Sequence, residues 1–151
     1  GRPGAESMPP ARPLAVLDTN VVLDWLLFRD PGVHPLADAV ACGALGWAAC
    51  PAMRTELAQV VARPALARWK PDPARLLADF DRHALLHADP PSRPMPPLRP
   101  SDADDQVFVD LALACGARWL FSHDRALLKL AGRARAHDLA ILRPMDWRGP
   151  G

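Results

Sequence analysis

Several features are scarce in this chain, and their scarcity excludes some classes of protein. Although half of the 151 residues are hydrophobic, no uninterrupted apolar run approaches the roughly 20 residues of a membrane helix. Only three cysteines occur, Cys42, Cys50 and Cys115, all in apolar surroundings and without the spacing of metal ligands. An odd number of thiols in buried-looking positions favours a reducing cytoplasm over a disulfide framework. We therefore expect a cytoplasmic protein that neither spans a membrane nor depends on disulfides.

Lysine and glutamate are also scarce. The lysines are Lys70 and Lys129 and the glutamates are Glu6 and Glu56, so arginine and aspartate supply nearly all of the charge. The net charge of +1 argues neither for nor against a nucleic-acid partner. We attribute the arginine content to a compositional bias. The same bias makes Glu56, the only glutamate inside the expected folded region, more noticeable.

The beginning of the chain shows no targeting signal. Residues 1–7 have neither a basic start nor an apolar stretch, so we expect no signal peptide. We expect residues 1–12 to be a disordered tail or a cloning remnant. Residues 13–148 are expected to form a single domain, because a chain of 151 residues suits one hydrophobic core.

Short apolar runs alternate with segments of helical periodicity. Strands are predicted at 14–17, 45–50, 118–122 and 140–143, and helices at 21–28, 35–41, 53–62, 73–87, 104–115 and 125–130. Six prolines between Asp89 and Pro100 predict a stiff, irregular connector. Alternating strands and helices favour right-handed crossovers and a parallel sheet with helices on both faces. The expected fold class is therefore α/β, a three-layer α/β/α sandwich with a central parallel sheet of four or five strands.

Acidic residues far apart in the sequence fall at expected strand ends or on the helices beside them. They are Asp18, Glu56, Asp105 and Asp124. Parallel strands would bring Asp18 and Asp124 to the C-terminal edge of the sheet, where α/β proteins place their sites. Carboxylates held together repel one another unless a cation neutralises them. The cluster therefore predicts bound Mg²⁺ or Mn²⁺ and hydrolysis of phosphate esters.

Two of these acids also have ordinary structural interpretations. Asp18 can cap the helix that follows it, although Thr19 and Asn20 are alternative caps that would leave Asp18 free. Glu56 can be a solvated surface residue or an ion-pair partner of a nearby arginine such as Arg54. Its place just after an expected strand is what draws attention to it.

The third acidic segment is denser than a helix start requires. Asp102, Asp104 and Asp105 suit the positive end of the helix dipole, which explains two of them. Asp105 lies three residues before Phe108 and hence near the inward face of the helix. A carboxylate there costs several kcal/mol without compensation, which favours a metal ion. In the fourth segment His123 is a further ligand candidate, although a solvated or hydrogen-bonded histidine is the more common case.

Together these segments resemble the PIN-domain family, a nuclease fold found in many toxins of bacterial toxin–antitoxin pairs. The resemblance extends from residue 14 to about residue 147. The motifs are Asp18-Thr19-Asn20, Thr55-Glu56-Leu57, Asp104-Asp105-Gln106 and Ser122-His123-Asp124, in the family's order and spacing. The form of the last two is most similar to a branch of VapC-like toxin components. The resemblance implies a PIN-like form of the three-layer sandwich.

The resemblance also implies an activity and a set of site residues. The activity is divalent-metal-dependent endonucleolytic cleavage of single-stranded RNA by a toxin that has a cognate antitoxin. Asp18, Glu56, Asp105 and Asp124 would hold one or two Mg²⁺ ions, for which Mn²⁺ can substitute. Ligand orientation is assigned to Asn20, Asp104 and Ser122. Contacts to backbone phosphates are assigned, by nearness in sequence, to Arg54, Arg99 and Arg125.

Two other functions and an assembly are considered. A haloacid-dehalogenase-type phosphohydrolase would need a second aspartate where this chain has Asn20. A non-catalytic RNA-binding module with the same fold is the second alternative. A homodimer through residues 21–28 is expected, because Val22, Trp25, Leu26 and Phe28 spread apolar area over more than one helix face. Packing of these side chains against the helix at 73–87 is the competing interpretation.

Overall fold

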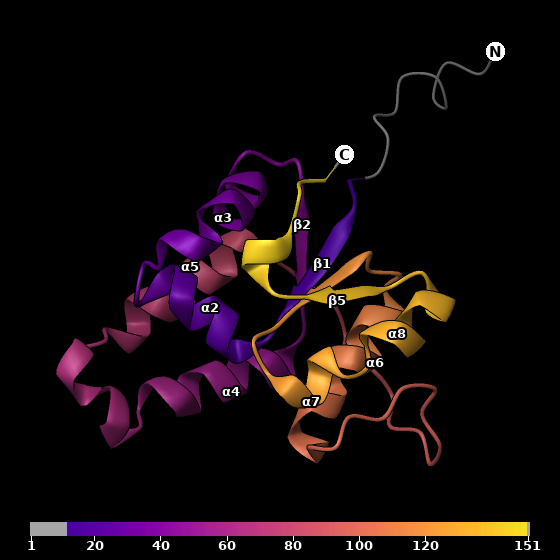
Figure 1. The fold of residues 1–151 in the computed structure, drawn as a ribbon. Coiled ribbons are helices and arrows are strands. Elements are labelled where there is room, and N and C mark those ends of the chain that lie inside the picture. Colours follow the sequence, from indigo (N-terminus) through magenta and orange to yellow (C-terminus); the bar gives the residue numbers. More distant parts are fainter. Residues whose placement is uncertain (1–11, 151) are drawn as a thin grey trace, which may run out of the picture.

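A parallel sheet of five strands forms the centre of the computed structural model, which describes residues 12–150 (Figure 1). The strands are β1 (Leu14–Leu17), β2 (Gly46–Ala49), β3 (Ala84–Leu86), β4 (Trp119–Phe121) and β5 (Ala140–Leu142). Their order across the sheet is β3-β2-β1-β4-β5, and all four pairings are parallel. The expected α/β class with a parallel sheet is confirmed. The predicted tail at 1–12 lies, except for Arg12, outside the described residues.

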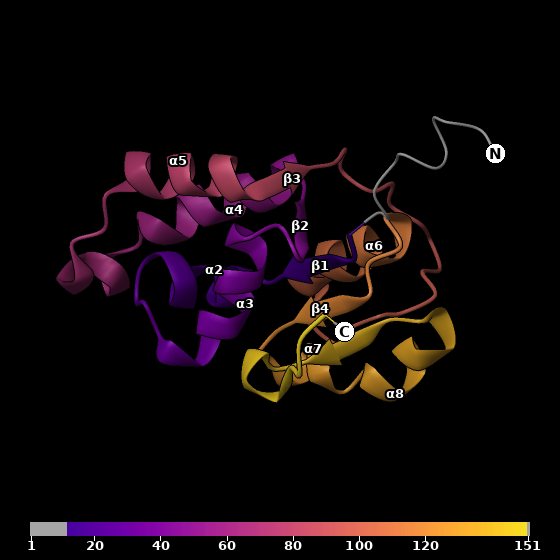
Figure 2. The same ribbon diagram turned by 90° about the horizontal axis from the view of Figure 1, so that it is seen from above.

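Helices flank the sheet on both sides. They are α2 (Thr19–Leu26), α3 (His34–Ala41), α4 (Pro51–Val61), α5 (Pro73–His83), α6 (Gln106–Ala114), α7 (Arg125–Leu128) and α8 (Ala131–Ala134). In both views, α2 to α5 lie on one side of the strands and α6 and α8 on the other (Figures 1 and 2). This arrangement agrees with the predicted three-layer sandwich.

The central strands are short apolar runs because both of their faces are covered. Three of the four residues of β1 are buried, as are all residues of β2 and β4. Such continuous apolar runs are typical of parallel strands that lie between two layers of helices. Trp47 and Phe121 are among the largest fully buried side chains.

The chain reverses its direction across the sheet beside β1. It runs from β1 outward to β2 and β3, and then returns to β4 and β5 on the other side of β1. The connecting helices change face at the same point (Figure 2). The loops after β1 and β4 therefore diverge at neighbouring strand ends. In open α/β sheets this is where ligands bind.

One predicted element is partly wrong. The helix expected at 73–87 ends at His83, and Ala84–Leu86 form the edge strand β3 beside β2. The error arose because Ala84 and Leu85 continue the apolar spacing of the helix, so periodicity gives no sign that the helix has ended. Cys42 also differs from expectation, since its side chain is exposed.

The apolar residues of α2 are largely covered within the chain. Val22 and Leu26 are buried in the core. The ring of Trp25 lies 5.6 Å from that of Trp47 and 4.9 Å from the imidazole of His83 at the end of α5. This is the competing interpretation given above. The argument for a homodimer through this helix is weakened accordingly, while the dimer itself stays a prediction.

Candidate active site

Asp18 is held at the point where β1 ends and α2 begins. Its Oδ1 accepts a hydrogen bond of 2.9 Å from the backbone N–H of Val21, and its Oδ2 accepts one from the hydroxyl of Ser122. Asp18 is therefore itself the helix cap, which is one of the two interpretations given above, and neither Thr19 nor Asn20 takes that role. Asp18 caps the helix from a buried position, since the residue is only 4% exposed.

Burial raises the pKa of Asp18 above its ordinary value. The hydrogen bonds from Ser122 and Val21 oppose that rise because they favour the charged form, and the nearby negative charge of Asp124 adds to it. Burial is the largest of these effects. The two hydrogen bonds therefore do not offset the cost of burying the charged form of the Asp18 carboxylate.

Ser122 connects the ends of the two central strands. Its hydroxyl donates to Asp18 and also accepts a hydrogen bond of 2.9 Å from the backbone N–H of Asp124. The Asp124 Oδ1 in turn caps α7 by accepting from the N–H of Ala126 at 2.8 Å. Ser122 is fully buried. One side chain thus couples two acids that are far apart in the sequence.

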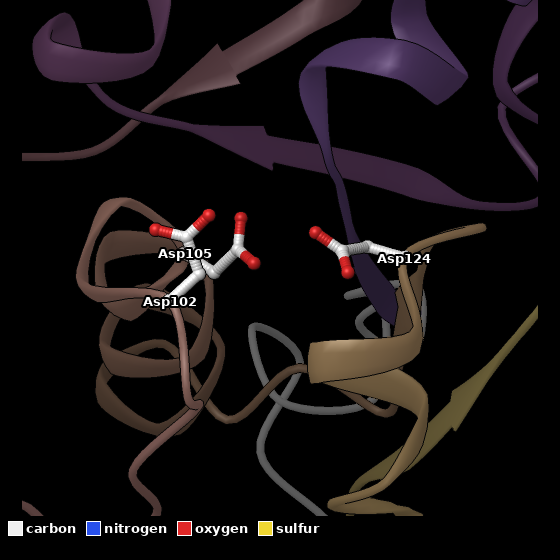
Figure 3. Close-up of side chains that lie close together, drawn as sticks. All are labelled: Asp102, Asp105 and Asp124. Carbon is white, nitrogen blue, oxygen red and sulfur yellow. The ribbon is translucent and has the colours of Figure 1, made fainter.

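A group of three carboxylates lies beside Asp18. Asp102, Asp105 and Asp124 each offer an oxygen, and these oxygens lie within 4.8 Å of one another. Figure 3 shows Asp102 and Asp105, at the start of α6, facing Asp124, which comes from the loop after β4. Asp102 also caps the short helical turn Ala103–Asp105 by accepting from the N–H of Asp104 at 3.0 Å. Sequence reasoning used Asp102 only as part of an acidic run and did not assign it to the site.

The chemistry of this group fits a divalent cation. Burial, together with the neighbouring Asp124, raises the pKa of Asp105 to about 7. Among residues 12–150, the buried Oδ2 of Asp105 has no hydrogen-bond partner. Carboxylate oxygens are the ligands that Mg²⁺ and Mn²⁺ prefer. A cation here would offset the repulsion between the carboxylates and would give the Oδ2 of Asp105 a partner.

Glu56 is connected to Asp18 through the neighbouring Thr19. It lies half-buried on α4, and its Oε2 accepts a hydrogen bond from the hydroxyl of Thr19, the residue after Asp18. Glu56 is not one of the three carboxylates grouped around Asp105. Thr19 was considered only as a helix cap, and no local pattern would have shown that it pairs with Glu56.

The remaining predicted residues differ in their exposure and in their hydrogen-bond partners. Arg54 forms a two-pronged ion pair with Asp81, with N–O distances of 2.8 and 2.9 Å. His123 contacts Asp24 through Nε2 at 2.9 Å, which agrees with the hydrogen-bonded alternative for this residue. The other predicted residues that are exposed are Asn20, Arg99, Asp104 and Arg125.

The fold thus gathers acidic side chains at the switch point of a parallel sheet. Residues 14–126 match the PIN domain family, and the chain belongs to it. PIN domains are in general nucleases and typically use divalent metal ions. No match is found among curated proteins. Among residues 12–150, no helix has the length and apolar character needed to cross a membrane.

Proposed function

We propose that the protein is a divalent-metal-dependent endoribonuclease that hydrolyses phosphodiester bonds of single-stranded RNA. The observation that carries the proposal is the Asp105 carboxyl, whose pKa is raised to about 7 and whose buried oxygen lacks a partner within residues 12–150. Acids whose pKa is strongly perturbed by burial and by a neighbouring charge are typical of reaction centres. Membership of the PIN family supports nuclease chemistry.

The residues present have distinct roles in this proposal. Asp18, Asp105 and Asp124 would hold Mg²⁺ or Mn²⁺, with Asp102 and Glu56 as further carboxylates near them. A bound ion of this kind supplies an activated water and offsets negative charge on the phosphate. Ser122 holds the carboxylate of Asp18 in place, and Thr19 does the same for Glu56. No serine or cysteine nucleophile is needed.

The Asp18→Asn and Asp105→Asn variants test the activity. Asparagine caps a helix about as well as aspartate, so Asp18→Asn removes charge while it retains the cap. We expect each variant to lose at least about a hundredfold in cleavage rate, the scale seen when an ion is poorly held. The assay compares single-stranded RNA, duplex RNA and DNA in Mg²⁺, Mn²⁺ and EDTA. Equal cleavage by wild type and variants would point to a contaminant and refute the proposal.

The alternative functions predict different results in this assay. A non-catalytic RNA-binding module would bind the RNA without cleaving it under any metal condition. The haloacid-dehalogenase alternative is not retained, because the chain belongs to the PIN family. The preference for RNA, a toxin role, a cognate antitoxin and a cytoplasmic location remain parts of the proposal. Growth arrest on expression, relieved by Asp18→Asn, would support the toxin role.

A further inference from the structure

A groove lies between the proline-rich connector and α6. The connector, residues 89–101, is called the strap below, and it runs alongside α6 on the side of the sheet away from α2 and α4 (Figures 1 and 2). The groove has a volume of about 570 Å³. Its lining residues are Ser92, Arg93, Pro94, Pro96, Arg99, Pro100, Ser101, Ala103, Gln106 and Asp110.

The groove lining includes direct sequence neighbours of the acidic cluster. Ser101 and Ala103, which line it, are the two sequence neighbours of Asp102, and Gln106 directly follows Asp105. Adjacent Cα atoms are only about 3.8 Å apart. The groove therefore lies near the backbone of Asp102 and Asp105, two members of the carboxylate group.

The strap is fastened to the domain at the groove. The amide of Gln106 donates to the backbone oxygen of Leu98 at 2.8 Å and to Asp110 Oδ1 at 2.9 Å. Leu98 is 1% exposed, and Pro100 is also buried. Proline fixes φ, so the strap has few conformations open to it. The groove is thus formed before any ligand arrives.

Two arginines in the groove lining are available to bind an anion. Arg93 and Arg99 are both exposed, and within residues 12–150 neither forms an ion pair. Arg54 is different, because its guanidinium is already paired with Asp81. The acid in the lining, Asp110, accepts a hydrogen bond from Gln106. The two free guanidinium groups match phosphate oxygens, which they can bind in a two-pronged manner.

We infer that this groove binds the backbone of the single-stranded RNA next to the phosphate that is cleaved, through Arg93 and Arg99. The inference rests on the proposed function and extends it to the path of the substrate. The lining contains no aromatic side chain on which a base could stack. The groove should therefore recognise phosphates rather than bases, and its contribution should not depend on sequence.

The test is binding of a short fluorescein-labelled single-stranded RNA in EDTA, where the proposed cleavage cannot occur. The variant is Arg93→Ala with Arg99→Ala. The matched control is Arg63→Ala with Arg133→Ala, which removes the same charge from exposed positions outside the groove lining. Each phosphate contact of a single strand contributes about 0.7 to the slope of log K against log salt. We expect the groove variant to bind RNA more weakly and the magnitude of the slope to fall by about 1.4. Both effects should be the same for RNAs of different sequence.

The outcomes separate this inference from the proposed function. If the groove variant and the control have equal affinity and equal salt slopes, the inference is overturned, even if the wild type cleaves RNA. Failure of the wild type to bind RNA overturns it as well. If binding depends on the two arginines but no RNA is cleaved in Mg²⁺ or Mn²⁺, the inference stands and the nuclease proposal fails. Thermal melting of all variants verifies that they are folded.

Discussion

Burial and the neighbouring Asp124 raise the pKa of Asp105 to about 7, from an ordinary value of 3.8. Between these values the metal-free folded protein retains a proton that the unfolded chain has released. Folding stability must then fall as the pH rises through this interval, because the charged form is disfavoured only in the folded state. At a pH below both values, Asp105 contributes no such dependence.

This reasoning gives a prediction for Asp105→Asn in EDTA. The variant cannot release a proton at this position, so it should lose less stability than the wild type between about pH 4 and about pH 7. Denaturant unfolding at several pH values measures the difference. Asp104→Asn, an exposed neighbour with the same change of charge, is the control. Parallel pH profiles for wild type and Asp105→Asn would contradict the raised pKa.

Ser122→Ala tests the link between the two central strands. The change leaves the buried Asp18 carboxylate without its side-chain donor, and a lost partner of a buried polar group costs about 1–3 kcal/mol. We expect the free energy of unfolding to fall by that amount, while the exposed Ser92→Ala should change little. A variant as stable as the wild type would mean that the hydroxyl does not support Asp18.

At the residue scale, sequence reasoning could place Asp18 and Asp124 because each follows an apolar strand. It could not assign Asp102 to the site, since an acid at a helix start has a sufficient local reason to be there. It also could not find the contact between Thr19 and Glu56, which are 37 positions apart. Such contacts depend on how α4 packs, and no local pattern encodes them.

At the scale of elements, Leu98 is a buried leucine through which the strap packs on the core. Leu98→Ala should reduce the free energy of unfolding by about 2–5 kcal/mol, as expected when a core leucine is truncated. The reason is that Leu98 is 1% exposed, whereas Met95 in the same strap is 89% exposed. Met95→Ala is therefore the matched control, measured by the same denaturant titration. Equal stability of the two variants would show that the strap is not packed on the core.

Most elements could be predicted because their apolar spacing is regular, but their ends could not. The start of α4 at Pro51 follows the preference of proline for the first helical turn, while the sequence reading began this helix two residues later. The strand β3 was missed because its apolar residues continue the spacing of the helix before it. Its identity comes from pairing with β2, which is a tertiary property.

At the scale of the whole molecule, the order of strands creates the site. Alternation of strands and helices predicts a parallel sheet, but it does not reveal which strands are neighbours. The pairing of β1 with β4 brings Ser122 to Asp18 across 104 positions of sequence. A different strand order would retain every local motif and separate these side chains.

The homodimer is the prediction that concerns assembly. Most of the apolar area of α2 is covered within the chain, and the exposed aromatic nearby is Trp69, which is 46% exposed and packs edge-on against Phe28 at 4.8 Å. A dimer through Phe28 would also bury Trp69, which the sequence analysis did not include in the predicted interface. Light scattering measures the mass in solution. A mass near 16.4 kDa would reject the dimer.

Metal binding should affect the stability of the whole domain. The grouped carboxylates come from segments on either side of α6, so they are brought together only in the folded chain. A ligand that binds only the folded state stabilises it by about 2.7 kcal/mol at a hundred times its dissociation constant. Mn²⁺ should therefore raise the melting temperature of the wild type.

The melting temperatures of the wild type and of Asp105→Asn should rank in opposite order in EDTA and in Mn²⁺. In EDTA the variant should melt at or above the wild-type temperature, because the substitution removes a carboxylate that is repelled by Asp124 and disfavoured by burial. In Mn²⁺ the wild type should melt above the variant, because the variant lacks one of the carboxylates that would hold the ion. Asp104→Asn, outside the carboxylate group, should respond to Mn²⁺ as the wild type does. If Asp105→Asn melts far below the wild type in EDTA, the carboxylate serves folding, and its assignment to metal binding is wrong.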